Sequence, residues 1–139
     1  MKNKYYTPDI EDLRVGYECE VYSFNIGGFD ITLQRDWFKF IISNEKDLID
    51  TIKLISLDLV RTPYLTKEQL KIEGWIIEEI EPLNPFIKGK KDSKELLFNR
   101  DNYELHLTNQ ISLNAIKLLY NGECKSINDF RYICKLLKI

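Results

Sequence analysis

The segment Trp37–Pro63, which reads WFKFIISNEKDLIDTIKLISLDLVRTP, decides the fold class. It opens with aromatic and β-branched residues through Ile42, a composition typical of a strand. Asn44 then suits the N-cap of a helix with Asp47 at its third position, and Pro63 cannot continue that helix. Between them an apolar stripe recurs at helical spacing: Leu48, Ile52, Ile55 and Leu59. The segment therefore predicts a strand followed by one main helix over about residues 45–60.

On the N-terminal side, the sequence predicts a short helix and a hairpin. Thr7 is expected to cap a helix that stops before Gly16, because Pro8 fits the first helical position and acidic residues follow it. Residues 17–24 then alternate with the period of a strand. After the turn signal Asn25–Gly28, residues 29–33 are expected to return as the second strand.

On the C-terminal side, helices and strands again alternate. Thr66 and Gln69 match a capping box for a short helix that ends at Gly74. Strands are expected over 75–80, 96–98, 103–107 and 111–120, the last with an irregularity near Asn114. They are joined by one long loop over 81–94, a hairpin connection over 99–102 and a tight turn at Asn121-Gly122. Ser126 then caps the last helix, over about residues 127–138.

Together these elements predict an α+β fold, because the helices interrupt runs of antiparallel strands. We expect a single compact domain over residues 1–139 with a mostly antiparallel sheet of about 5–7 strands, two main helices and two short ones.

Composition excludes several classes of protein. The apolar fraction of 44% is that of a folded chain, and 20 basic against 22 acidic residues give a net charge of −2. That charge is too near neutral to bind nucleic acid by bulk attraction or to imitate DNA. The longest run without charged residues, Leu105–Ile116, is far shorter than the about 20 residues of a membrane helix, and no apolar segment follows the N-terminal lysines. Three scattered cysteines indicate reduced thiols, so we expect the cytoplasm of a host cell and no membrane.

Catalytic chemistry has weak support in the sequence. His106, the only histidine, shares a strand face with Glu104 and could act as a general base, but a solvated strand face explains it as well. Cys124 precedes the last helix, whose N-terminus could lower its thiol pKa, while Cys19 and Cys134 fit buried positions. We therefore expect no enzyme activity and no catalytic residue.

Metal and cofactor sites are not expected either. The chain has no Cys-x-x-Cys, no second histidine and no calcium-loop spacing. Gly27-Gly28 lacks the lysine and the following helix of a phosphate-binding loop, so a hairpin turn explains it.

A basic segment offers the clearest candidate contact with a partner or RNA. It comprises Lys88, Lys90, Lys91 and Lys94, followed by Arg100 at the tip of the next hairpin. Basic groups beside aromatic residues such as Phe86 and Tyr103 can hold single-stranded nucleic acid. The alternative is a solvated loop that keeps the domain soluble.

Three short pieces of the chain resemble a group of small uncharacterised phage and prophage proteins. The first opens Tyr-Thr-Pro at Tyr6–Pro8, continues with an acidic turn and closes with Gly-Tyr-Glu at Gly16–Glu18. The others run from Arg61 to Trp75 and from Tyr120 to Ile139, where a strand, a turn and a Lys-rich helix end the chain. The resemblance implies a phage source and carries over no catalytic residue.

Without reactive groups at workable separations, the chain is expected to act by contact. The leading hypothesis is a non-enzymatic phage protein that binds and inhibits a host defence complex. Its sharpest form is an anti-CRISPR protein acting on an RNA-guided nuclease, a ribonucleoprotein, or on its guide-RNA loading. The alternatives are a small single-stranded nucleic-acid-binding module and an accessory or structural phage protein. Exposed aromatic and arginine side chains would anchor a protein partner, and the candidates are Tyr5, Tyr6, Trp37, Trp75 and Arg100.

Overall fold

The computed structural model describes residues 4–24, 35–78 and 83–139, and its chain divides into two compact units. Unit 1 is Met1–Tyr64 and unit 2 is Leu65–Ile139. Each unit pairs an antiparallel sheet with helix, so the α+β class is confirmed. The single domain over the whole chain stays a prediction.

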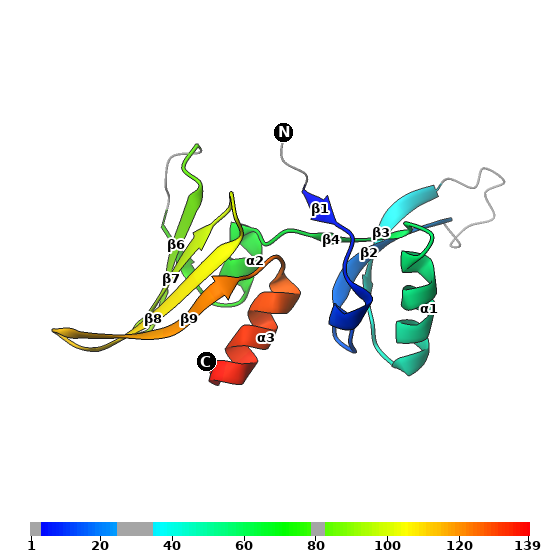
Figure 1. The fold of residues 1–139 in the computed structure, drawn as a ribbon. Helices are drawn as coiled ribbons and strands as arrows, with labels where there is room; N and C mark the ends of the chain where they lie inside the picture. The colour runs from blue at the N-terminus through cyan, green and yellow to red at the C-terminus, as the bar shows by residue number, and fades with distance from the viewer. Residues whose placement is uncertain (1–3, 25–34, 79–82) are drawn as a thin grey trace. The chain divides into compact units, whose positions relative to one another are not determined.

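In its described residues, unit 1 is a four-stranded antiparallel sheet with one α-helix, α1, on one face (Figure 1). Its strands lie in the order β1 (Tyr5–Tyr6), β4 (Val60–Pro63), β2 (Glu18–Phe24) and β3 (Arg35–Ile41). The core between sheet and helix is formed by Leu13, Tyr17, Cys19, Ile42 and Val60, with Leu48 and Ile52 of α1 packed against it.

The main helix is shorter than the sequence predicts. Asn44 caps it as expected, since its side-chain oxygen accepts a hydrogen bond from the Asp47 amide at 2.8 Å. The helix α1 covers Glu45–Ile55, however, and not 45–60, because the chain turns through Asp58 (φ +56°) and Val60 enters strand β4.

The N-terminal helix differs in a similar way. It is a single 3-10 turn, η1 (Ile10–Asp12), and the residue at its N-cap is Asp9, so the predicted Thr7 cap is wrong. The predicted turn at Gly27-Gly28 and the strand over 29–33 lie outside the described residues.

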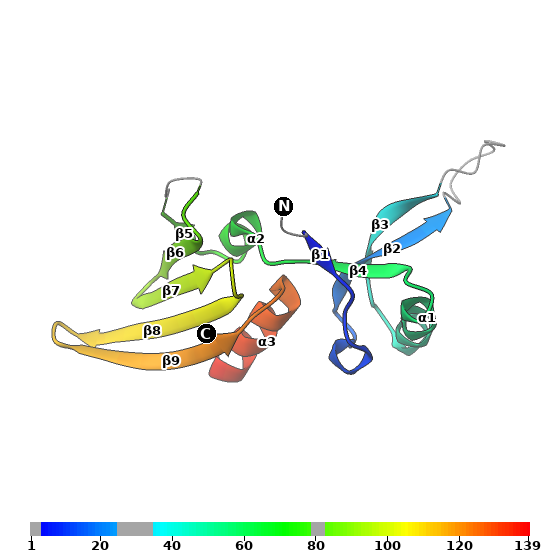
Figure 2. The same ribbon diagram turned by 45° about the horizontal axis from the view of Figure 1, so that its top comes forward.

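Unit 2 is a five-stranded antiparallel meander packed on two helices (Figure 2). The strands follow one another as β5 (Ile76–Ile77), β6 (Phe86–Lys91), β7 (Lys94–Asn99), β8 (Glu104–Ser112) and β9 (Ala115–Glu123). The helices are α2 (Lys67–Ile72) and α3 (Ile127–Leu137). Alternate strand residues, Ile87, Leu96, Phe98, Leu105 and Leu107, form one core with Leu70, Ile127, Phe130 and Ile133 of the helices.

The predicted helix ends of unit 2 are confirmed. Thr66 and Gln69 make both hydrogen bonds of a capping box, and Gly74 follows α2 with φ +96°. Ser126 caps α3 through the Asp129 amide, and the Asp129 carboxylate accepts in return from the Lys125 amide at 2.9 Å.

Three predictions about the strands of unit 2 are wrong. The expected loop over 81–94 contains β6, which pairs with β7 along its whole length. Residues 111–120 are not one strand, because a turn at Leu113-Asn114 separates β8 from β9. Asn121-Gly122 is no turn but lies inside β9, opposite His106 and Leu105. In the first and third of these cases strand pairing overrides the local turn signal.

Candidate interaction surfaces

The five basic residues singled out from the sequence lie in three separate places of unit 2. Lys88 and Lys90 are exposed on one face of β6. Lys91 and Lys94 pair with each other at the end of the β6–β7 hairpin, and alternation puts them on the opposite face. Arg100 follows β7, where its guanidinium donates to the Asn84 carbonyl. The structure therefore does not join these residues into one basic patch.

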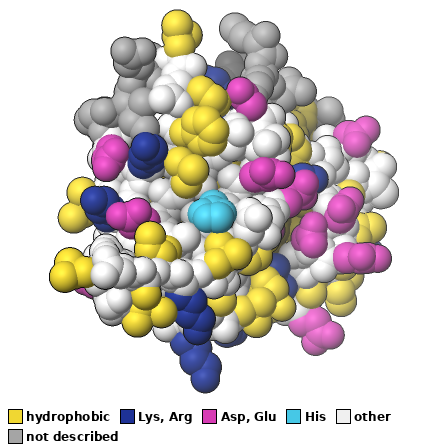
Figure 3. All heavy atoms as spheres, turned by 60° about the vertical axis from the view of Figure 1, so that its left-hand side comes forward, with side chains coloured by type: hydrophobic (Ala, Val, Ile, Leu, Met, Phe, Trp, Pro, Cys, Tyr) yellow, Lys and Arg dark blue, Asp and Glu magenta, His cyan; other side chains and the backbone are white. Residues whose placement is uncertain are grey.

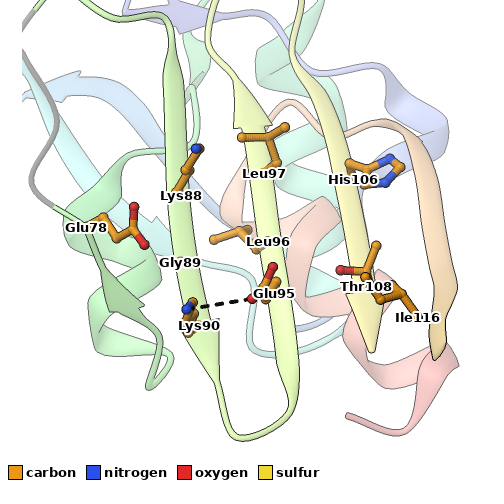
Figure 4. Close-up of a pocket in the computed structure, with 10 residues that line it drawn as sticks. All are labelled: Glu78, Lys88, Gly89, Lys90, Glu95, Leu96, Leu97, His106, Thr108 and Ile116. Carbon is orange, nitrogen blue, oxygen red and sulfur yellow. Dashed lines mark ion pairs between the residues drawn. The ribbon is translucent and has the colours of Figure 1, made fainter. Parts of the chain in front are cut away.

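The face of the unit 2 sheet opposite its core, here called the outer face, carries a hollow of about 510 Å³. Direct strand pairing sets Lys88, Leu97 and His106 in one row across β6, β7 and β8 (Figure 4). In the next row, Lys90 and Glu95 form an ion pair at 3.7 Å. Figure 3 shows His106 in the middle of this face, which carries apolar side chains together with acidic and basic ones. Mixed charge of this kind does not form a continuous track for a phosphate backbone.

His106 lies exposed in that row. Its ring has no hydrogen-bond partner among the described residues, and its direct cross-strand neighbours are Leu97 and Asn121. Glu104 shares its face but is paired with Asn99 and Glu123. Among the described residues, no hydrogen bond or ion pair joins the His106 ring to the Glu104 carboxylate.

Cys19 and Cys124 are buried, as Cys19 was predicted to be, whereas Cys134 is only half-buried. Burial raises the pKa of Cys19 and of Cys134 to about 11 in each case. Burial, and secondly the Asp129 carboxylate, also raise the pKa of Cys124, so the nearby helix N-terminus does not produce a thiolate. In the part of the chain that the structure describes, no three His, Cys, Asp or Glu side chains gather as metal ligands.

The face of the unit 1 sheet away from α1 carries a stack of aromatic and cationic side chains. The Arg61 guanidinium lies 3.7 Å from the ring centroid of Tyr5 and 4.2 Å from that of Trp37. The Trp37 ring in turn lies 5.2 Å from that of Tyr22. The four residues, one from each strand, are here called the aromatic platform.

Strand register brings the platform residues together, and the Glu20 carboxylate fixes the position of Arg61. Tyr22 is directly opposite Trp37, and Glu20 is directly opposite Arg61. One Glu20 carboxylate oxygen accepts from Arg61 Nε at 2.8 Å and from Nη2 at 2.7 Å. Each cation–π contact contributes about 0.5–2 kcal/mol. The platform is therefore a preorganised surface that a partner could bind without ordering it first.

The structure sorts the anchors predicted from the sequence. The anchors were predicted only on condition that they are exposed, and Trp75 is instead buried in the unit 2 core with its ring 6.0 Å from Phe130. Tyr5, Tyr6 and Trp37 are partly exposed, and Arg100 is exposed.

Arg61 and Tyr22 were missed from the sequence. Alternation already put Tyr22 on one face with Glu20. The strand that brings Arg61 beside them was hidden by the predicted end of the main helix.

The chain matches no protein-family model, no curated protein and no solved structure. Within the described residues, no helix combines the length and the apolar character needed to cross a bilayer.

Proposed function

We propose that this chain is a non-enzymatic binding protein whose aromatic platform contacts a protein partner. Following the resemblance to phage proteins, we propose a host defence complex as the partner, and inhibition by occupying its surface as the action. An RNA-guided nuclease is the sharpest form of this proposal. The observation that carries it is the platform itself, since Trp, Tyr and Arg are the side chains that most often dominate binding energy at protein interfaces.

The platform favours a protein partner over single-stranded nucleic acid. Tyr5 and Trp37 each have one ring face covered by Arg61, which leaves fewer faces on which bases could stack. Glu20 beside Arg61 neutralises the cation that a phosphate would need. Glu18 lies on the same sheet face by strand alternation and adds a second carboxylate.

Removing one aromatic anchor should weaken such a complex strongly. Truncation of a central Trp costs about 2–4 kcal/mol at protein interfaces, or about 30- to 1,000-fold in the dissociation constant. We therefore expect Trp37→Ala to abolish retention of the partner in a washed capture experiment.

The test is affinity capture with mass spectrometry from bacterial hosts that carry defence systems. The tagged chain is compared with Trp37→Ala and with Ile49→Ala, a control on α1 that is 48% exposed on the other side of unit 1. A defence protein retained by the unmodified chain and by Ile49→Ala, but lost with Trp37→Ala, supports the proposal. Recovery of no defence protein, or equal retention by all three chains, refutes it.

A further inference from the structure

Strand β9 forms a long open edge of the unit 2 sheet. Among the described strands it pairs with β8 alone, and it runs for 9 residues, whereas β5 at the other edge has 2. An edge strand presents unpaired backbone N–H and C=O groups to any extended segment that meets it. Proteins usually protect long edges with charged residues, prolines or bulges.

Protection of this edge is slight. From Ala115 to Gly122 the only charged residue is Lys117, and there is no proline. Two irregularities interrupt the register with β8, one between Leu107 and Thr108 and one between Gln110 and Ser112 on that strand. The Tyr120 hydroxyl donates to the Glu123 carbonyl at 2.8 Å, which occupies one group at the C-terminal end and leaves the rest of the edge open.

The same hairpin exposes four aliphatic side chains. Leu105 and Leu107 at the base of β8 are fully buried. Beyond them the hairpin extends past the other strands of its sheet (Figures 1 and 2). There Ile111 is 63% exposed, Leu113 95%, Ile116 71% and Leu118 54%. A two-stranded hairpin with its apolar side chains in water is marginally stable unless another surface covers it.

We propose that a second copy of this chain adds its β9 antiparallel to the first, which joins two five-stranded sheets into one of ten strands. The open backbone groups require an extended segment, and a nearly uncharged partner strand suits the side chains of Ile116 and Leu118. The β9 strand of a second copy has both properties. Antiparallel pairing about a twofold axis is closed, so association stops at the dimer.

Charge also restricts where the two strands meet. Lys117 has no ion-pair partner among the described residues. A pairing centred on Lys117 would set two ammonium groups directly opposite each other, which is unfavourable. The twofold axis therefore lies away from Lys117. Because strand pairs bury little area compared with the about 1,000 Å² of a stable interface, we expect dimerisation to depend on concentration.

The test is sedimentation velocity on the full chain from micromolar to near-millimolar concentration. We expect a monomer–dimer equilibrium that the double variant Ile116→Lys with Leu118→Lys weakens at least about tenfold. The matched control is Ile72→Lys, which changes an aliphatic side chain 80% exposed on α2 and should keep the dimer. Circular dichroism and urea unfolding confirm that each variant is folded.

Hydrogen exchange gives a second readout that folding defects would not imitate. In the unmodified chain, amides of residues 115–122 should exchange more slowly as concentration rises, while those of β6 should not change. A monomer at every concentration overturns the proposal, and so does a dimer that Ile72→Lys disrupts and the β9 variant does not. Trp37→Ala should keep the dimer, so failure of this proposal is distinguishable from failure of the proposed function.

Discussion

The substitution Gly89→Ala tests whether residue 89 lies in a packed strand or in a solvated loop, because the free energy of unfolding should fall in the first case and rise in the second. Gly89 lies in β6 between Ile77 of β5 and Leu96 of β7, its direct partners. A Cβ added there would stand 2.5 Å from Leu96 Cδ2 and 2.8 Å from Ile77 Cδ1. Both distances are far below van der Waals contact, so neighbouring side chains must move.

The magnitude follows from what has to move. Leu96 is 2% exposed and belongs to the unit 2 core, so rotating it disturbs its neighbours. Overpacking of this kind costs about 1–3 kcal/mol. In a loop the same change would stabilise the fold by about 0.4–1 kcal/mol, because alanine restricts the unfolded chain. We therefore expect Gly89→Ala to lower the free energy of unfolding.

Urea unfolding followed by tryptophan fluorescence measures the change. The chain has two tryptophans, and a Trp37→Phe background leaves the signal to Trp75, which is 4% exposed in the same unit as Gly89. Lys88→Ala, on the outer face of the same strand, is the matched control and should change stability by no more than about 0.5 kcal/mol. Unchanged or higher stability of Gly89→Ala would refute the close packing of β5, β6 and β7.

Three further predictions concern other parts of the chain. The Tyr17 and Thr62 hydroxyls lie 2.9 Å apart and are buried, so Tyr17→Phe should lower the free energy of unfolding by about 1–3 kcal/mol. Adding Thr62→Val should cost less than the sum of the two single effects, and strict additivity in this double-mutant cycle would contradict a coupled pair. Burial raises the pKa of Cys134 to about 11. The rate at which an aromatic disulfide labels this thiol should therefore rise about tenfold per pH unit between pH 8 and pH 10. A rate that levels off near pH 9 would disprove this. Lys88 and Lys90 are separated from the other basic groups. For any binding of single-stranded DNA, the logarithm of the binding constant should therefore fall with the logarithm of the salt concentration with a slope no steeper than about −1.4, and binding should vanish when both lysines become alanine. A much steeper slope would indicate a continuous basic track.

Local signals in the sequence were sufficient for the starts of the three α-helices, but not for the N-terminal 3-10 turn or for strand pairing. Asn44, Thr66 and Ser126 cap their helices as predicted, because a cap needs only a side chain and an amide three residues away. Gly89 was interpreted as a loop residue, although its role is to let neighbouring strands approach closely, and that depends on partners distant in sequence.

The candidate surfaces could not be predicted from the sequence for the same reason. Trp37 was predicted as an anchor, but its neighbour Arg61 lies 24 positions further along the chain. Only the pairing of their two strands with β2 brings these side chains together. Lys88 and Lys91 were likewise grouped because they are close in sequence. The alternation of side chains along β6 places them on opposite faces of the sheet.

The boundary between the two units falls between two consecutive residues of the chain. The Tyr64 amide donates to the Lys4 carbonyl at 3.0 Å within unit 1, and the amide of Leu65 donates to the Lys125 carbonyl at 2.8 Å within unit 2. Each unit is a continuous piece of chain, so one crossover in the coding sequence at this point would exchange a whole unit and leave every hydrogen bond within the other unit unchanged. Mosaic descendants that combine one half of this chain with a different companion half are therefore an expected product of recombination.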